Sequence, residues 1–261
     1  MLQNRYVGDV GDFGKYGLLR TLCLPVDSDG PALRLGVVWY LASDETHNND
    51  GRHIGYLEPT SKNVQTFRAC DPSLYDSLAD IVRDGARNIS AIRQRRVLPD
   101  DTVFYERLLD LGRRRAHPSL DSRMQARQEW VQSALRVTNK CDVVFVDPDN
   151  GIGTTAQASS RLGAKYVLLE ELVPYVSRGQ TLVIYHHLNR SAAAETQVSQ
   201  RLAELEERLP PQVRVMALRY RRGSARVFFV LTMAPQVAGL LEMRLAQMGV
   251  GPWREHFMRV A

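Results

Sequence analysis

The chain of 261 residues is 44% hydrophobic and carries a formal net charge of +5, with three cysteines, Cys23, Cys70 and Cys141. This composition allows one large hydrophobic core, while the wide cysteine spacing argues against a disulfide framework and a Cys-x-x-Cys metal site. No apolar run approaches the roughly 20 residues that span a bilayer, and the first residues lack the pattern of a secretory signal. We therefore expect a cytoplasmic protein without a membrane partner.

The N-terminal segment has a glycine at every third position. The glycines are Gly8, Gly11, Gly14 and Gly17. The polar residues between them are Asp9, Asp12, Lys15 and Tyr16. Glycine lets a backbone approach a ligand closely, and the start of a helix presents free amide groups to anions. The pattern predicts a glycine-lined loop that leads into a short helix.

Four elements are expected next along the chain. We expect the first strand at residues 33–41. We expect a helical insertion at residues 60–97, because apolar residues recur there at spacings of three and four. The same kind of spacing predicts two further helices, at residues 103–111 and 125–135.

The next predicted strand, residues 142–146, stops abruptly at Asp147-Pro148-Asp149-Asn150, and Gly151 closes the turn. A buried parallel strand is almost continuously apolar, and ligands bind beyond the carboxyl ends of such strands in open α/β sheets. We therefore expect Asp147 and Asp149 to line a pocket. The same residue types also form ordinary tight turns without any function, so that interpretation stays open.

Two further strands end in polar groups. A loop with Asp44 and His47 follows the first strand, and a strand at 181–185 runs into His186 and His187. Adjacent residues of a strand face opposite ways, so one of these two histidines should point into the core and the other towards the cleft. Together with the strand that ends at Asp147, three strands thus end in polar side chains, and we expect these side chains to lie at one edge of the sheet and form a reactive site there.

The remaining elements continue the alternation of strands and helices. We expect a helix at 166–175, a helix at 191–209, strands at 213–220 and 226–232, a helix at 236–247 and an exposed tail. Arg221-Arg222-Gly223-Ser224 between the last two strands predicts a β-hairpin. The whole pattern predicts an α/β protein whose mostly parallel sheet ends in an antiparallel hairpin.

Arginine supplies most of the positive charge, and thirteen of the arginines fall in two stretches. The first contains Arg83, Arg87, Arg93, Arg95, Arg96, Arg107, Arg113, Arg114 and Arg115, and the second contains Arg219, Arg221, Arg222 and Arg226. Either stretch could contact the phosphates of a nucleic acid, although arginines on a solvated helix face also serve solubility.

Two of these motifs resemble those of a known family. Gly8-Asp9-x-x-Asp12-x-x-Lys15-Tyr16 resembles the Gly-Asn-x-x-Asp-x-x-Lys-His block of the bacterial large-subunit ribosomal RNA adenine-N6 methyltransferases, and Asp147-Pro148 matches the start of their Asp-Pro-Pro-Tyr motif. The resemblance covers nearly the whole chain in order. It implies one domain, residues 1–261, with the class I, Rossmann-like methyltransferase fold, a three-layer sandwich that carries the helical insertion at 60–97.

The resemblance also implies roles for individual residues. The cofactor would be S-adenosylmethionine, held by Gly8, Asp9, Asp12, Lys15, Tyr16 and Asp44. Asp147 and Pro148 would receive the target amine of an RNA or DNA base for chemistry of the adenine-N6 kind. Asp149 and Asn150 complete the catalytic motif at positions where the family has proline and an aromatic ring, and the arginine-rich insertion would clamp phosphates.

Two alternatives use the same sheet. Asp44, His47, Asp147, Asp149 and His186 could hold Mg²⁺ or Mn²⁺ in a metal-dependent nuclease or phosphoesterase. A noncatalytic member of the fold could instead bind nucleic acid alone. Both catalytic interpretations require the glycine-rich N-terminal segment to fold over the sheet and meet the Asp147 loop.

Overall fold

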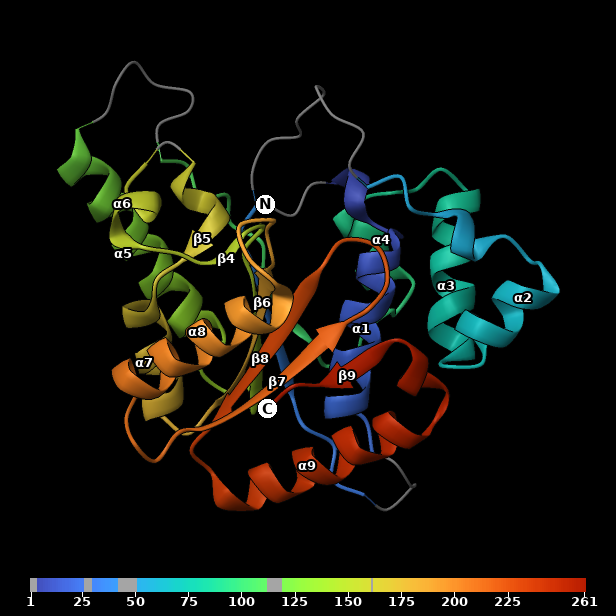
Figure 1. Ribbon diagram of the computed structural model, residues 1–261. Helices are drawn as coiled ribbons and strands as arrows, with labels where there is room; N and C mark the ends of the chain where they lie inside the picture. The colour runs from blue at the N-terminus through green and yellow to red at the C-terminus, as the bar shows by residue number, and fades with distance from the viewer. Residues whose placement is uncertain (1–3, 26–29, 42–50, 112–118, 161) are drawn as a thin grey trace.

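The computed structural model describes residues 4–25, 30–41, 51–111, 119–160 and 162–261, and they form an α/β fold around a seven-stranded sheet (Figure 1). The strand order is β2-β1-β3-β6-β8-β7-β9. The strands are β1 (Leu35–Trp39), β2 (Val103–Tyr105), β3 (Val143–Asp147), β6 (Thr181–His187), β7 (Arg214–Tyr220), β8 (Arg226–Thr232) and β9 (Phe257–Arg259). Strands β1, β2, β3 and β6 pair in parallel, while β8 lies antiparallel between β6 and β7. A separate parallel pair consists of β4 (Gly151–Ile152) and β5 (Tyr166–Val167).

Helices cover both faces of the sheet and make three layers (Figure 1). On one face lie α5 (Leu120–Val137), α7 (Leu169–Ser177) and α8 (Ala194–Arg208). On the other lie α1 (Val10–Cys23), α3 (Pro72–Arg83), α4 (Ile89–Gln94) and α9 (Pro235–Val250). The short helical segments are η1 (Asn4–Tyr6), η2 (Gly55–Leu57), α2 (Ser61–Asn63), η3 (Val64–Arg68), α6 (Thr155–Ala158), η4 (Gly163–Lys165) and η5 (Pro252–Glu255).

The apolar runs of the central strands are buried because both of their faces pack against helices. In β3, Val143 and Phe145 join the core on the α1 side, whereas Val144 and Val146 join the core on the α5 side. This alternation follows from the period of two in a strand. It fixes the register of β3, since a slip of one residue would exchange the two faces. Within the described ranges, no helix is both long and apolar enough to cross a bilayer.

Three of the four N-terminal glycines lie inside a helix, which corrects the prediction of a glycine-lined loop. Helix α1 begins at Val10 and therefore contains Gly11, Gly14 and Gly17 as a stripe along one side. A Cβ added at Gly14 would lie 2.4 Å from the Tyr220 ring, and one at Gly17 would lie 2.2 Å from Trp253. The stripe thus exists because the C-terminal elements pack directly on the backbone of α1.

Replacing Gly17 by Ala should destabilise the protein even though alanine favours helix. The new methyl group would overlap the buried Trp253 ring, and overpacking of this kind typically costs about 1–3 kcal/mol. Gly239 in α9 is the matched control, because nothing lies within 4 Å of its added Cβ and Gly→Ala should stabilise an open helical position by about 0.5–1 kcal/mol. Urea unfolding of both variants measures the difference, and equal effects at the two sites would contradict the packing argument.

Three other expectations about secondary structure were wrong. Residues 103–105 form the edge strand β2 rather than the start of a helix, and Tyr166–Val167 forms β5 before α7 begins at Leu169. The C-terminal tail is not exposed throughout, because Trp253 and Phe257 are buried and β9 extends the sheet beside β7.

The insertion at 60–97 is helical as predicted and lies between β1 and β2 in the chain. Side chains of Asp71 and Asn88 cap its two main helices, since each accepts a hydrogen bond from a backbone amide three residues on. Arg20 of α1 binds the Asp71 carboxylate at 2.6 Å. The insertion is therefore fixed to the same helix that carries the N-terminal motif.

Candidate functional site

The carboxyl ends of β1, β3 and β6 meet at one edge of the sheet. Because the three strands are adjacent and parallel, their last residues lie side by side, and Trp39 pairs with Asp147 in the β1·β3 register. The N-terminal half of α1 lies at this edge, because Lys15 of α1 contacts Asp147. The juxtaposition of the N-terminal segment with the Asp147 loop, which the catalytic interpretations require, is confirmed.

A buried cluster of three charged side chains forms the centre of the site. Lys15 Nζ donates a hydrogen bond to Asp147 Oδ2 at 2.8 Å and lies 3.2 Å from Asp12 Oδ1. The side chains of Lys15, Asp12 and Asp147 are no more than 8% exposed. The rings of Phe145 and Tyr185 lie within 6 Å of the ammonium group, so its charge is held by carboxylates and aromatic faces together.

The electrostatics of this cluster keep Lys15 charged. Burial alone would lower the pKa of Lys15, but the Asp147 and Asp12 carboxylates outweigh it and hold that pKa above its ordinary value. Burial raises the pKa of Asp12 to about 6, against the opposing effect of Lys15. Two carboxylates share one ammonium group, so at neutral pH the cluster has an excess of negative charge.

Asp9 fixes the entry of the chain into α1. Its Oδ1 accepts a hydrogen bond from the backbone amide of Gly11 at 2.9 Å, which makes it the N-cap of the helix. Its Oδ2 accepts from the backbone amide of His53 at 3.0 Å. One carboxylate thus ties the segment after the first strand to the start of α1, beside the Lys15 cluster.

A pocket of about 320 Å³ opens at this edge of the sheet. Its charged lining residues are the carboxylates of Asp9, Asp12, Asp147 and Asp149 and the basic groups of Lys15, Lys165 and Arg226. Its other lining residues include Tyr6, His53, Asn150, Tyr185, His187 and Ser224. The volume lies at the lower end of the range that small-molecule sites occupy, and the lining is strongly polar.

The loop after β3 is held by a second set of contacts. Asp149 forms an ion pair with Lys165 at 3.2 Å. The backbone amide of Asn150 donates to the carbonyl of Lys165 at 2.9 Å, and the carbonyl of Asn150 accepts from the amide of His187 at 3.3 Å. Gly151 has a φ of +97°, a conformation that favours glycine. The loop therefore has one defined shape rather than that of a loose turn.

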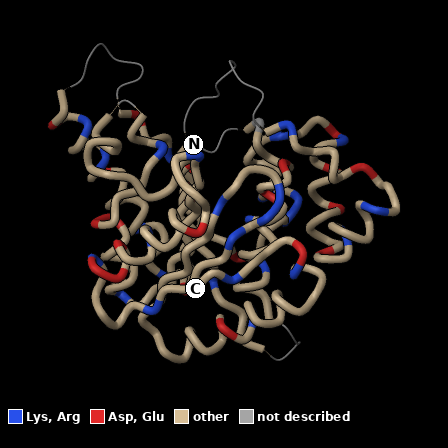
Figure 2. The backbone as a smooth tube through the Cα atoms, viewed as in Figure 1, with Lys and Arg blue, Asp and Glu red and all other residues tan. Residues whose placement is uncertain are grey.

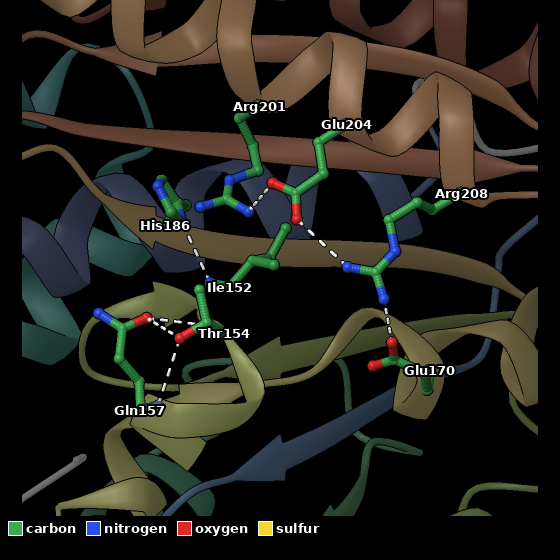
Figure 3. A network of polar contacts seen from close by, with 8 residues as sticks. All are labelled: Ile152, Thr154, Gln157, Glu170, His186, Arg201, Glu204 and Arg208. Carbon is green, nitrogen blue, oxygen red and sulfur yellow. Dashed lines mark hydrogen bonds and ion pairs between the residues drawn. The ribbon is translucent and has the colours of Figure 1, made fainter.

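The two histidines at the end of β6 face opposite ways, as predicted. His187 lines the pocket, and its Nδ1 lies 3.5 Å from the Tyr185 hydroxyl. His186 is buried, and its Nδ1 accepts a hydrogen bond from the backbone amide of Ile152 at 3.0 Å (Figure 3). His186 does not fit the role of a metal ligand at this site: a neutral ring whose Nδ1 accepts the Ile152 amide carries its proton on Nε2, and the residue does not line the pocket.

The contacts around Ile152 continue outward on the same side. Thr154 caps α6 through reciprocal bonds with Gln157, and a chain of ion pairs links Arg201, Glu204, Arg208 and Glu170 (Figure 3). Two of these pairs lie within α8, and the pair of Arg208 with Glu170 joins α8 to α7. They help to hold α7 and α8 together on the side of the sheet where His186 contacts Ile152.

Acid should destabilise the protein through His186. Burial lowers the pKa of His186 to about 3, whereas the unfolded chain binds a proton near the ordinary value of about 6.5. Between these values the unfolded state holds more protons, so stability falls as the pH falls, by about 2 kcal/mol at pH 5 for this one group. His186→Asn keeps an acceptor for Ile152 but does not titrate. Urea unfolding between pH 7 and 5 should show a shallower loss in this variant, and an unchanged slope would refute the assignment.

Arg226 lines the pocket and lies against the start of α1. Its Nη2 donates to Ser224 Oγ at 2.6 Å and its Nε donates to the Ser224 carbonyl at 3.1 Å. A Cβ at Gly11 would lie 1.7 Å from Nη1, so only glycine lets the guanidinium lie against α1. The guanidinium carbon is also 5.9 Å from the Tyr185 ring. The base of the β7–β8 hairpin and the first turn of α1 thus pack directly against each other.

Several residues predicted for the site lie elsewhere or cannot be placed. Gly8, Tyr16 and Pro148 are buried and do not line the pocket. Gly8 accepts a bond from the Tyr56 hydroxyl through its carbonyl, and Tyr16 donates to Asp12 at 3.4 Å. Asp44 and His47 lie outside the described residues. Within the described ranges, no group of three or more His, Cys, Asp or Glu side chains lies close enough to hold a metal ion.

Other site residues were missed from the sequence. Lys165, Tyr185 and His53 line the pocket but stand in no recognised motif. One signal was available: the chain has only four lysines, Lys15, Lys62, Lys140 and Lys165, and two of them line this pocket. In an arginine-rich protein, lysine at two such positions indicates a need for a compact ammonium group.

Comparison with known proteins gives little further information. No protein-family model matches the chain, and no curated protein matches it. Among solved structures, the chain is similar to protein LPL1258 from Legionella pneumophila str. Philadelphia 1, of family DUF519, with 11% sequence identity and a TM-score of 0.44 over 97% of this chain and 95% of that chain. A likeness at this level says nothing about the chemistry of the site.

Proposed function

We propose that the protein is an S-adenosylmethionine-dependent methyltransferase that acts on an amine of a nucleic acid. The contact that carries this proposal is the 2.8 Å hydrogen bond between Lys15 and Asp147. It joins the two segments whose sequences resemble the adenine-N6 methyltransferases, although 132 residues separate them. The order of the sheet is a second support, since β8 lies antiparallel at the place where the class I, Rossmann-like methyltransferase fold has its antiparallel last strand.

The described residues fit a cationic cofactor. S-adenosylmethionine supplies an activated methyl group on a positively charged sulfur and also carries an ammonium group. Asp9, Asp12 and Asp147 line the same pocket, and their charge exceeds that of the neighbouring Lys15. Arg226 and Lys165 line the pocket as well and would suit a carboxylate. This assignment of Asp9, Asp12 and Lys15 agrees with the roles that the sequence resemblance implies.

Asp147 would bind and orient the attacking amine. Among the described residues, Lys15 is the one donor to its side chain, and it uses Oδ2 alone. The other carboxylate oxygen can accept a hydrogen bond from the amine and direct its lone pair. Lys15 supplies the counter-charge that a buried carboxylate needs. Methyl transfer needs mainly such alignment in a desolvated pocket.

Asn150 leaves the site without the aromatic ring that stacks on a base in the resembling family. Two other rings, Tyr6 and Tyr185, line the pocket instead. Tyr185 is almost fully buried, while Tyr6 is half-buried in the short helix η1. A flipped base could therefore contact Tyr6. Tyr6→Ala should accordingly weaken the binding of the nucleic acid and spare that of the cofactor.

Calorimetry with S-adenosylhomocysteine, followed by Mn²⁺, tests the proposal. Binding of the nucleoside supports it, and transfer of label from tritiated S-adenosylmethionine to unmodified RNA or DNA transcripts would establish it. Binding of Mn²⁺ with cleavage of the same transcripts, and no nucleoside binding, would favour the metal-dependent nuclease or phosphoesterase. Affinity for nucleic acid with neither small ligand bound would indicate a noncatalytic protein.

A further inference from the structure

Five arginines of the insertion already have acidic partners. Arg68 binds Asp76 at 2.8 Å, Arg83 binds Asp80 at 2.7 Å and Arg95 binds Asp84 at 2.5 Å. Arg93 pairs with Glu106, and Arg96 lies 3.3 Å from Asp100. Positive and negative segments lie close together in this part of the chain (Figure 2). A phosphate would have to compete with a carboxylate for each of these side chains.

The turn of the β7–β8 hairpin differs from the insertion in this respect. Arg221 is exposed and Arg222 half-buried, and neither forms an ion pair with any residue that the structure describes. The same holds for exposed Arg52, in the segment after the first strand. Figure 2 shows the hairpin turn as a positive segment. We call Arg52, Arg221 and Arg222 the hairpin rim.

The hairpin rim lies beside the pocket. The carbonyl of His53 accepts a hydrogen bond from the amide of Val10 at 3.0 Å, and a Cβ at Gly223 would lie 2.9 Å from the Val10 side chain. The segment with Arg52 and the hairpin turn therefore both contact the start of α1. Their neighbours His53 and Ser224 line the pocket itself.

Arg222 is positioned by packing rather than by an ion pair with a described residue. Its guanidinium carbon lies 5.8 Å from the centre of the Phe67 ring, and its Nε is buried without a hydrogen-bond partner. A ring face orients a guanidinium while leaving its charge unneutralised. Arginines that form no ion pair with a described residue are available to an external anion, and these three adjoin residues that line the pocket.

We infer that the hairpin rim is the surface that holds the phosphate backbone of a nucleic acid across the pocket, and that the arginine-rich insertion does not take part. The inference builds on the proposed function, because it names the surface that receives the substrate. It replaces the expectation that the insertion clamps phosphates. Bound there, a strand would present its bases to the acidic edge at Asp147.

Fluorescence anisotropy with a labelled single-stranded RNA, and with a DNA of the same sequence, tests the hairpin rim. The variant Arg52→Gln/Arg221→Gln/Arg222→Gln should bind about tenfold or more weakly than the wild type, and the slope of log affinity against log salt should fall by about 2–3. The matched control, Arg83→Gln/Arg95→Gln/Arg96→Gln, removes the same charge from the insertion and should change affinity by less than about threefold. The RNA and DNA arms show which backbone is preferred.

Two further measurements separate the possible failures. Arg52→Gln/Arg221→Gln changes only exposed side chains and should give an intermediate loss, which guards against misfolding caused by Arg222. The triple rim variant should bind S-adenosylhomocysteine as the wild type does. If the wild type binds no S-adenosylhomocysteine but the rim variant still loses affinity for nucleic acid, the proposed function is wrong and the assignment of the rim as a nucleic-acid surface is retained. Equal losses of nucleic-acid affinity in the rim and control variants would contradict the assignment of the rim as a nucleic-acid surface. A wild type with no affinity for nucleic acid would contradict it as well.

Discussion

Asp147→Asn should reduce methyl transfer by about 10²–10³-fold, the loss typical of removing one preorganised electrostatic contact to a reacting group. The side chain keeps its size, and its amide oxygen can still accept from Lys15. The remaining position then carries an NH₂ group, which faces the target amine as a second donor. The acceptor that orients the nucleophile is lost, while the pocket keeps its shape. Single-turnover transfer from tritiated S-adenosylmethionine measures the effect.

Asp149→Asn is the matched control, because Asp149 stands two residues away and forms the partly exposed pair with Lys165. For methyl transfer its loss should cost less than about tenfold, since a screened pair contributes little. Calorimetry with S-adenosylhomocysteine should give similar affinities for both variants. Normal turnover in Asp147→Asn would reject the proposed role. A metal-dependent cleavage that Asp149→Asn abolishes would favour the hydrolase instead.

The parts of the fold that could be predicted from sequence are those whose signal is local. Strands β3 and β6 are continuous apolar runs because helices cover both of their faces. The hairpin turn at Arg221-Arg222-Gly223-Ser224 is marked by glycine, which has a φ of +68° at Gly223. The polar residues that end the parallel strands pointed to the edge where the pocket lies.

The errors arose where a distant segment decides the local structure. Glycine disfavours a helix by about 1 kcal/mol per residue, so the glycine repeat pointed to a loop. Tyr220 and Trp253, more than 200 positions later in the chain, are what make glycine necessary in α1. Residues 103–105 carry apolar side chains at ambiguous spacing, and only pairing with β1 makes them a strand.

The site shows the same division. The meeting of Lys15 with Asp147 could be anticipated, because both stand in motifs with a recognisable order. Lys165 and Tyr185 could not, since they reach the pocket from the end of η4 and from β6 without any local pattern. His186 was predicted to be a possible ligand by its residue type, whereas its burial and its bond to Ile152 make it a structural support. Residue type indicated the chemistry available but not the direction of the side chain.

Lys15→Met should be among the most destabilising substitutions of the chain. Methionine fills the space of the lysine stem but removes the ammonium group that lies 2.8 Å from Asp147 and 3.2 Å from Asp12. Two buried carboxylates are then left without a counter-charge, and breaking a buried ion pair in this way costs about 3–5 kcal/mol. The same change in the partly exposed pair, Lys165→Met, should cost less than about 1 kcal/mol.

The loss in Lys15→Met should depend on pH, which separates charge from packing. Burial already raises the pKa of Asp12 to about 6, and removal of Lys15 raises it further. A carboxyl with a raised pKa binds a proton in the folded state, so its stabilising effect is present at low pH and is lost as the pH rises through that pKa. Urea unfolding should therefore show a smaller deficit at pH 5.5 than at pH 8, and Asp12→Asn should restore part of the deficit at pH 8. A deficit that is equal at the two pH values would mean that Lys15 serves the fold through packing alone.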